Sequence, residues 1–572
     1  MITEQIQAKI NTWLNSGIDE DSKASIRAMS DTDLADAFYK DLEFGTGGLR
    51  GIMGVGSNRM NKYTVGMATQ GLANYLKKCF PNETVKVAIA HDSRNNSRFF
   101  AETTAAVFSA NGIHVYLFEE LRPTPELSYA IRKLGCKSGV VLTASHNPKE
   151  YNGYKAYWED GAQVISPHDK NIIKEVQAIS GVEQVKFEKD DSKIELIGRA
   201  VDEAYINEIL NLTLNAEAIE RQNQLKIVFS PIHGTAITLV PEVLERKGFK
   251  NVTVVEEQAT PDGNFPTVVY PNPEEREAMS IALAKAKAIN ADLVMATDPD
   301  ADRVGIAAKN ESGEFEILNG NQAATLLIYY LLTQWKNRGK LDGRQMIVKT
   351  IVTTDLLDKI AAGFGVDCPN TLTGFKFIAA LIRELEGKKE FIGGGEESYG
   401  YMISDFVRDK DAIASCAMLA EMCAWAKDQG LSVFDLLAKI YREYGFYLED
   451  LISITKKGMK GAEEIQQMMA DFRANPPATL AGQQVVRSID YQASISKDLL
   501  TGNETTIDLP KSNVLQFLLQ DGSKVSARPS GTEPKIKFYI SVNAPLANSE
   551  AYQQVKESLK AKIEHIKADL KL

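Results

Sequence analysis

Cysteine is scarce in this chain, and what there is does not cluster. No two cysteines share a CxxC spacing, and the five are Cys79, Cys136, Cys368, Cys416 and Cys423. The odd number and wide spacing exclude a disulfide framework and the usual structural zinc sites. They are typical of reduced thiols, so we expect a cytoplasmic protein.

Long apolar runs and an excess of basic residues are also missing. The longest apolar stretch, 323–332, is far shorter than the roughly 20 residues that a membrane-spanning helix needs. The first residues lack a basic segment followed by an apolar one, so we expect no signal peptide. The formal net charge is -11, which disfavours nucleic acid and anionic membranes as partners. A few local Arg and Lys side chains can still bind a small anionic substrate.

The 572 residues are enough for three or four domains. From about 44 to 320, short apolar runs alternate with helical patterns, which is typical of α/β units with largely parallel sheets. The expected strands are 85–90, 115–118, 139–142, 225–229, 252–255 and 293–296, with a helix over 273–289. A third α/β stretch follows, with helices over 321–335 and 412–427 and strands near 346–349 and 391–392.

The two ends of the chain differ from this α/β pattern. The first 40 residues are polar with helical spacing and predict a surface helical extension. The last 120 residues predict a small α+β domain with an antiparallel sheet, formed by a helix over 461–472 and strands near 485–488, 514–519 and 535–542. Its final helix has one apolar face, made of Val555, Leu559, Ile563, Ile566 and Leu570. The expected domains are 1–195, 196–318, 319–445 and 446–572.

Ser145 stands where a buried strand is expected to end. The apolar run 139–142 predicts the strand, and 143–148 reads Thr-Ala-Ser-His-Asn-Pro. Open α/β sheets place their chemistry beyond the carboxyl ends of the strands. His146 and Lys155 are close in sequence, so we expect an activating base and a phosphate-pairing cation nearby. Taken alone, Ser145 fits an ordinary polar turn equally well.

Three aspartates alternate in a short loop after the strand expected at 293–296. Asp298, Asp300 and Asp302 can point at one centre, and hard oxygen ligands suit Mg²⁺. An EF-hand would need Gly at the sixth position and Glu at the twelfth, where this chain has Arg303 and Lys309. Asp302 also departs from the Asp-x-Asp-x-Thr/Val pattern of haloacid-dehalogenase-type phosphatases. The loop therefore predicts a magnesium site.

Two further loops combine glycine with polar side chains. Residues 393–400 read Gly-Gly-Gly-Glu-Glu-Ser-Tyr-Gly, in which Glu396 and Ser398 alternate and could bind vicinal hydroxyls in one pocket. Residues 528–534 read Arg-Pro-Ser-Gly-Thr-Glu-Pro, in which Arg528, two hydroxyls and the Gly531 amide could form a phosphate nest. A flexible hairpin and a solvent-facing turn are the alternative interpretations.

In this order, the four motifs resemble those of the α-D-phosphohexomutase superfamily, and the resemblance extends from Phe44 to about Val542. It implies three α/β domains with mixed sheets and a smaller α+β C-terminal domain around a central cleft. In that superfamily the serine loop carries a phosphoserine and the three-aspartate loop binds Mg²⁺. The Gly-Glu-x-Ser loop binds sugar hydroxyls, and the C-terminal loop holds the distal phosphate.

The resemblance implies roles for individual residues, and three more stretches support it: 45–50, 373–376 and 408–411. The metal ligands would be Ser145, Asp298, Asp300 and Asp302. The catalytic residues would be Ser145, Lys155, His146 and Arg50. The substrate-binding residues would be Glu396, Ser398, Lys376, Arg303, Lys410, Arg528, Ser530, Gly531 and Thr532.

The sugar loop indicates which branch of the superfamily the chain resembles. Bacterial phosphomannomutase/phosphoglucomutases often read Gly-Glu-Met-Ser-Gly-His, whereas this chain reads Gly-Glu-Glu-Ser-Tyr-Gly. Its lack of histidine resembles the glucose-directed and pentose-directed branches, and above all the bacterial phosphoglucomutases.

The resemblance therefore implies an intramolecular phosphotransferase of the isomerase class. We expect it to interconvert glucose 1-phosphate and glucose 6-phosphate through a phosphoserine and a bound bisphosphate. One Mg²⁺ per chain and glucose 1,6-bisphosphate as activator would be required. A phosphomannomutase, a phosphopentomutase and a non-catalytic sugar-phosphate-binding homologue remain the alternatives.

Overall fold

The chain begins with three short helices that share a small core. The computed structural model describes residues 2–45, 47–456, 458–530 and 535–572. The side chains of Thr3, Asp19 and Ser30 accept hydrogen bonds from backbone amides at the helix starts, which satisfies donors that a helix leaves unpaired. The helices are α1 (Glu4–Asn15), α2 (Glu20–Ala28) and α3 (Asp31–Phe38). Their buried side chains pack against the next part of the chain through Tyr63 and Val182.

The first sheet has the strand order β1-β5-β4-β2-β3-β6. Its strands are β1 (Gly48–Ile52), β2 (Lys86–His91), β3 (His114–Phe118), β4 (Ser138–Leu142), β5 (Tyr151–Trp158) and β6 (Ile194–Ile197). Its helices are α4 (Lys62–Cys79), α5 (Ser97–Ala110), α6 (Thr124–Lys133) and α7 (His168–Gln177). Strands β2, β3, β4 and β6 are parallel, whereas β5 is antiparallel to both β4 and β1. The β4–β5 pair sets Val141 opposite Lys155, which brings this lysine close to the loop after β4.

The second sheet has the order β11-β10-β9-β7-β8. Its strands are β7 (Ile227–Ser230), β8 (Val252–Val254), β9 (Leu293–Thr297), β10 (Val304–Lys309) and β11 (Phe315–Leu318). Its helices are α8 (Arg199–Asn211), α9 (Ala216–Arg221), α10 (Val240–Lys247), α11 (Glu256–Ala259) and α12 (Arg276–Ile289). Strands β7, β8 and β9 are parallel, and β10 and β11 are antiparallel additions. The three aspartates occupy the connection from β9 to β10.

The third sheet has the order β13-β12-β14-β15. Its strands are β12 (Gln345–Thr350), β13 (Asn370–Thr371), β14 (Glu390–Gly395) and β15 (Tyr401–Ile403). Its helices are α13 (Gly320–Asn337), α14 (Leu356–Phe364), α15 (Phe375–Glu384), α16 (Ala412–Asp428) and α17 (Val433–Tyr444). The glycines of β14 allow close packing, because a Cβ on Gly394 would lie 2.3 Å from the carbonyl oxygen of Val348.

The fourth sheet is antiparallel throughout. Its strands are β16 (Phe446–Thr455), β17 (Thr479–Leu480), β18 (Gln483–Asp490), β19 (Ile495–Asp498), β20 (Glu504–Thr506), β21 (Leu515–Leu519), β22 (Lys524–Pro529) and β23 (Lys535–Ala544). Its helices are α18 (Gly458–Ala474) and α19 (Tyr552–Asp569). Leu559, Ile563 and Ile566 of α19 are buried, as the apolar face predicted, and Val555 and Leu570 are partly buried against the same core.

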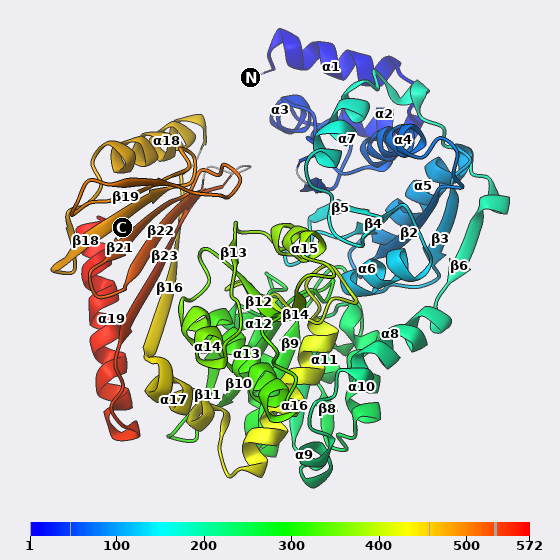
Figure 1. The fold of residues 1–572 in the computed structure, drawn as a ribbon. Coiled ribbons are helices and arrows are strands. Elements are labelled where there is room, and N and C mark those ends of the chain that lie inside the picture. The colour runs from blue at the N-terminus through cyan, green and yellow to red at the C-terminus, as the bar shows by residue number, and fades with distance from the viewer. Residues whose placement is uncertain (1, 46, 457, 531–534) are drawn as a thin grey trace.

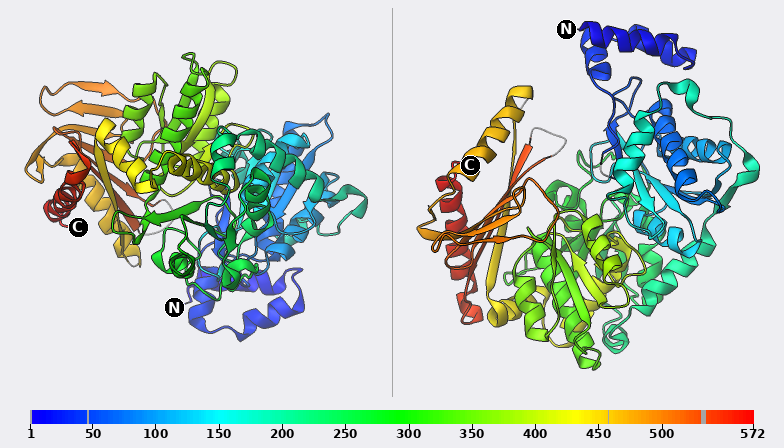
Figure 2. Two further views of the ribbon diagram at one scale, coloured as in Figure 1. Left: turned by 90° about the horizontal axis from the view of Figure 1, so that it is seen from below. Right: turned by 45° about the horizontal axis from the view of Figure 1, so that its top comes forward.

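The two middle sheets lie between the first and the fourth (Figures 1 and 2). The predicted fold class is confirmed: three α/β parts with mixed sheets and an α+β part at the C-terminal end. The expectation of largely parallel sheets is confirmed as well, because parallel pairs form the centre of each of the first three sheets, and antiparallel pairs are added at one edge. The four sheets span 48–197, 227–318, 345–403 and 446–544. The domain boundaries drawn from the sequence remain a proposal.

Candidate active site

Ser145 lies three residues beyond the end of β4 and is buried. Its backbone amide donates to Thr143 Oγ1 at 2.8 Å. Its φ is +52°, a left-handed conformation that costs energy in any residue with a Cβ. Such strained positions persist only where the surroundings hold them, and they cluster at functional sites.

The aspartate loop meets the serine across the two sheets. The Ser145 hydroxyl donates to Asp298 Oδ2 at 2.8 Å. The other oxygen of Asp298 accepts the amides of Asp302 and Arg303, at 3.1 and 3.0 Å, which fixes the loop. Asp298, Asp300 and Asp302 are all buried. The structure therefore brings together the two motifs that the sequence separates by 150 residues.

Two lysines from other parts of the chain offset the negative charge. Lys155 Nζ lies 2.7 Å from Asp300 Oδ2 and 3.1 Å from Asp302 Oδ2. Lys410 Nζ lies 3.3 Å from Asp302 Oδ2 and 3.0 Å from Asp409 Oδ1. Buried charges are stable only when they are paired. The first, second and third α/β parts thus all contribute charge to one centre.

The pKa values of the aspartates are driven in opposite directions. Burial, followed by the charges of Asp302 and Asp300, raises the pKa of Asp298 well above its ordinary value. Burial would also raise the pKa of Asp302, but the positive charges of Lys155 and Lys410 hold that pKa well below its ordinary value. Crowded carboxylates disfavour one another's ionisation, and a bound cation would relieve that repulsion.

The three aspartates have the geometry of a cation site. One oxygen from each lies within 4.8 Å of the others. Asp300 Oδ1 and Asp302 Oδ1 are buried yet accept no hydrogen bond within the described structure. Buried acceptors without partners are uncommon, so a role as ligands accounts for them. An all-oxygen donor set suits Mg²⁺.

His146 lies next to the serine hydroxyl. Its Nδ1 is 3.2 Å from Ser145 Oγ. Burial, followed by the positive charges of Arg303 and Arg50, lowers the pKa of His146 well below its ordinary value. A neutral imidazole can accept a proton, so His146 is placed to exchange one at this oxygen. Arg50 acts on it from β1, where it pairs with Gly153 of β5.

Arg303 connects the aspartate loop to the sugar loop. Its Nη1 lies 2.9 Å from Glu274 Oε1 and donates to the carbonyl oxygen of Ser398 at 3.2 Å. Glu396 is buried at the end of β14, and its Oε1 accepts the amide of Gly374 at 2.8 Å. Ser398 lines a cavity together with Glu397 and Tyr399. That Glu396 and Ser398 bind sugar hydroxyls in one pocket stays a prediction.

That cavity has a volume of about 240 Å³ and separates the sugar loop from the fourth sheet. Lys537 of β23 lines it from the C-terminal side, and it pairs in register with Arg528 of β22. Arg528 is half-buried, and Ser530 is exposed. Gly531 and Thr532 lie outside the described residues. This end of the fourth sheet therefore lies across the cavity from the sugar loop. Among the described residues, no recorded interaction joins Arg528 directly to the aspartates.

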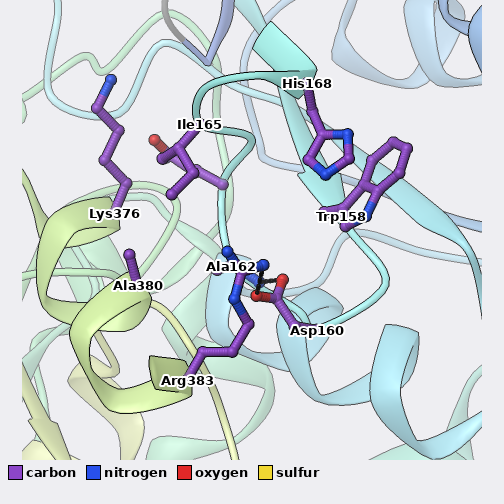
Figure 3. Close-up of a pocket in the computed structure, with 9 residues that line it drawn as sticks. Trp158, Asp160, Ala162, Ile165, His168, Lys376, Ala380 and Arg383 are labelled. Atoms are coloured by element: carbon purple, nitrogen blue, oxygen red, sulfur yellow. Dashed lines mark hydrogen bonds and ion pairs between the residues drawn. The ribbon is translucent and has the colours of Figure 1, made fainter. Parts of the chain in front are cut away.

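Lys376 lies apart from the serine and the aspartates, in the first turn of α15. It lines a small pocket between α15 and the first sheet, together with Trp158, His168 and others (Figure 3). Its amine points away from the Arg383–Asp160 ion pair, whose atoms are 2.9 Å apart (Figure 3). Burial lowers the pKa of Lys376. Its Nζ lies 5.3 Å from the centroid of the Phe377 ring.

Sequence reasoning missed Thr124 and Glu274. The Thr124 hydroxyl donates to Asp300 Oδ2 at 2.9 Å, and its amide donates to the Asp300 carbonyl oxygen at 2.9 Å. Both residues orient charged groups of the site from outside the recognised motifs. The Arg-Pro-Thr-Pro sequence at 122–125 spans the start of α6, but nothing in it signals Asp300 as the partner of Thr124.

Comparison with known proteins places this arrangement in a family. Three family models match, described as phosphoglucomutase/phosphomannomutase alpha/beta/alpha domains I, II and III, over residues 41–183, 203–313 and 319–444. The chain belongs to the phosphoglucomutase/phosphomannomutase family. The resemblance to the α-D-phosphohexomutase superfamily is thereby confirmed.

Individual relatives agree with this assignment. The chain is 36% identical to a phosphoglucomutase of Staphylococcus haemolyticus, over 91% of this chain and 93% of the relative. It is 37% identical to a phosphoglucomutase of Staphylococcus aureus strain MRSA252, over 93% and 95%.

Solved structures share the fold. Parafusin from Paramecium, a phosphoglucomutase in an open form, has a TM-score of 0.69 at 19% identity and covers 93% of this chain and 96% of its own. A phosphoglucomutase/phosphomannomutase family protein from Burkholderia thailandensis has a TM-score of 0.63 at 20% identity, over 92% and 97%. No helix among the described residues is long and apolar enough to cross a membrane.

Proposed function

We propose that this chain is a Mg²⁺-dependent phosphoglucomutase that interconverts glucose 1-phosphate and glucose 6-phosphate. The observation that carries the proposal is the 2.8 Å hydrogen bond from the Ser145 hydroxyl to Asp298, at the edge of a buried three-aspartate cluster. The staphylococcal relatives, which are named phosphoglucomutases, support the choice of glucose. We place the protein in the cytoplasm, with a sugar phosphate as its partner and neither nucleic acid nor membrane.

One Mg²⁺ would be held by Asp298, Asp300 and Asp302, with a phosphate on Ser145 completing the site. Bound there, the ion would neutralise charge on the phosphoryl group, which is what phosphoryl transfer chiefly requires. Lys155, Lys410 and Arg303 add fixed positive charge around the same centre.

The phosphoryl group passes between Ser145 and the sugar in two steps. First, the bond from phosphorus to Ser145 Oγ breaks as a new bond forms to a sugar hydroxyl oxygen; that hydroxyl loses its proton, and Ser145 Oγ gains one. The product is glucose 1,6-bisphosphate. After the bisphosphate turns over, the bond from its other phosphorus to the sugar oxygen breaks as a new bond forms to Ser145 Oγ; Ser145 Oγ loses its proton, and the freed sugar oxygen gains one. His146, neutral and 3.2 Å from Ser145 Oγ, and the charged Lys155 are the groups placed to move these protons.

The remaining proposed residues hold the sugar in either orientation. The sugar loop would bind hydroxyls through Glu396 and Ser398. The distal phosphate would be held at the C-terminal loop by Arg528, Ser530, Gly531 and Thr532. Lys376, Lys410 and Arg303 complete the proposed set of substrate contacts, and Arg50 is a proposed catalytic residue. Free glucose 1,6-bisphosphate would act as an activator by restoring phosphate to any chain that has lost it.

A coupled assay with four sugar 1-phosphates tests this function. We expect the highest kcat/KM with glucose 1-phosphate, and lower values with the mannose, ribose and N-acetylglucosamine compounds. A preference for mannose or ribose would identify a phosphomannomutase or a phosphopentomutase instead. The absence of turnover with every compound, in the presence of Mg²⁺ and bisphosphate, would leave a non-catalytic binding protein.

A further inference from the structure

Arg94 is a buried arginine to which the proposed function assigns no task. It lies in the short connection between β2 and α5, and its side chain is completely buried. An arginine is almost never buried without a defined set of partners, because its charge cannot be removed by deprotonation. Its partners therefore indicate what it does.

The guanidinium of Arg94 binds the serine loop through main-chain oxygens. Nη2 donates to the carbonyl oxygens of Ser145 and Asn147, both at 2.5 Å. Nη1 donates to those of Pro148 and Tyr151, at 2.9 and 3.1 Å. A single planar group thus joins four carbonyls between 145 and 151. The single ammonium nitrogen of a lysine could not reproduce this fork.

The orientation of the guanidinium is itself fixed. Asp92 Oδ2 lies 3.3 Å from Arg94 Nε. The other oxygen of Asp92 accepts the Arg94 amide at 2.9 Å and the Ser97 hydroxyl at 2.6 Å. The ring of Phe265, from the second sheet's part of the chain, lies 5.0 Å from the guanidinium carbon. Contacts with Asp92 and Phe265, neither of which belongs to the serine loop, therefore fix the orientation of the guanidinium.

These contacts act on the strained residue that would carry the phosphoryl group. Ser145 has φ +52°, and its hydroxyl reaches Asp298 in that conformation. Thr143 Oγ1 binds its amide, and Arg94 binds its carbonyl oxygen. Both peptide groups that flank the Ser145 side chain are therefore held from outside the residue.

We propose that Arg94 is a positioning residue, whose forked contacts hold Ser145 in the left-handed conformation that aims its oxygen at the aspartate cluster. The fork, rather than the positive charge alone, does this. The expected effect on turnover rests on the proposed function, in which Ser145 carries the phosphoryl group. The expected effect on the conformation of the loop does not depend on that function.

The first test separates the fork from the charge. Arg94→Lys keeps the charge, Arg94→Met removes it, and Arg98→Lys is the control, because Arg98 is an exposed arginine in the first turn of α5. We expect kcat to fall on the order of 10²-fold in both Arg94 variants, the cost of a misplaced reacting group, with KM for glucose 1-phosphate nearly unchanged. Wild-type kcat in Arg94→Lys would overturn the proposal, and so would a loss that appears only in KM.

The second test does not depend on activity. Hydrogen exchange of the peptide covering 143–152 should be faster in Arg94→Lys than in the wild-type protein, while exchange in β7 and β9 is unchanged. Equal exchange in the loop would overturn the proposal even if turnover fell. If Arg94→Met failed to fold, Arg94→Lys would carry both tests. If the wild-type protein did not turn over sugar phosphates, the proposed function would fall, and the exchange measurement would still decide the role of Arg94.

Discussion

Asp300 concentrates several features of the site in one carboxylate. One oxygen accepts from both Lys155 and Thr124, and the other is buried without a hydrogen bond. Asn in its place would keep the shape but lose the charge. Because even outer-shell partners of a metal are worth about 10–100-fold, Asp300→Asn should reduce turnover by roughly 100-fold or more. The measurement is kcat at saturating Mg²⁺, together with a melting curve to verify folding.

The matched control for this variant is Glu277→Gln, an exposed acidic residue on α12 in the same part of the chain. It should retain wild-type kcat. Chelation of divalent cations should abolish turnover in both the wild-type and the control protein. Full activity of Asp300→Asn, or of the wild-type protein in excess chelator, would mean that the aspartate cluster is purely structural.

At the residue scale, the sequence identified the groups that stand in compact motifs. The serine and the three aspartates could be recognised because each follows an apolar run that ends in polar residues. Thr124, Glu274 and Arg94 could not, because each acts on a residue that is distant in the sequence and stands in no motif that signals its partner. Which carboxylate each lysine pairs with likewise depends on the tertiary fold.

At the element scale, the turn between β22 and β23 is the proposed clamp for the phosphate that is not at Ser145. Arg528 stands at the end of β22, and its fork matches phosphate oxygens. Losing one charge-assisted bond costs about 1.5–3 kcal/mol, which is roughly ten- to a hundredfold in affinity. Arg528→Ala should therefore raise KM and release the bisphosphate more often.

Turnover measured against added glucose 1,6-bisphosphate tests this expectation. The Arg528→Ala curve should shift to higher concentrations, because each escape leaves Ser145 without phosphate. Arg487→Ala, which removes an exposed arginine from β18 of the same sheet, should match the wild-type protein. Identical curves for all three proteins would show that the distal phosphate is held elsewhere.

The elements that the sequence predicted are those with continuous apolar runs. Strands β4 and β9 are fully buried, as their aliphatic residues indicated. Strand β5 was missed, although it is almost entirely buried, because its sequence Tyr-Asn-Gly-Tyr-Lys-Ala-Tyr-Trp has no aliphatic run or simple alternation. The antiparallel strands β10 and β11 were missed as well, and their pairing is what makes the second sheet mixed.

At the scale of the whole molecule, Glu449 lies where β16 leads into the fourth sheet and lines the cavity facing the sugar loop. Burial raises the pKa of Glu449 to about 7. The hydrogen bond with Thr354 lowers this pKa, whereas the negative charge of Asp355 raises it. A carboxyl whose pKa is raised on folding stabilises the fold while it is protonated. That contribution is complete below its unfolded pKa of about 4.3 and is lost as the pH rises through 7.

Glu449→Gln cannot ionise, so it should melt at a higher temperature than the wild-type protein at pH 8. A rise of about 2–4 °C would correspond to roughly 1 kcal/mol in a domain of moderate size. The difference should disappear near pH 5. Glu550→Gln, an exposed residue before α19, is the control and should show no such pH dependence. An equal shift at both pH values would rule out the ionisation of Glu449 as the cause.

The whole arrangement depends on three α/β parts that supply charged residues to one site, and on a fourth part that faces the sugar loop across the cavity. Motif order and the family resemblance predicted that the four parts would contribute different residues to the site. They could not predict that Glu396 accepts the amide of Gly374, because that contact depends on how β14 and the start of α15 pack together.

The central claim is that the phosphoryl group passes through Ser145, and a transfer experiment tests it most directly. The protein is incubated with glucose 1,6-bisphosphate carrying labelled phosphate, freed of sugar, and analysed by peptide mass spectrometry. Unlabelled glucose 1-phosphate is then added. We expect label on Ser145 after the first step, and in the newly formed bisphosphate and in glucose 6-phosphate after the second. Label on another residue, or label on Ser145 that glucose 1-phosphate fails to remove, would contradict the account.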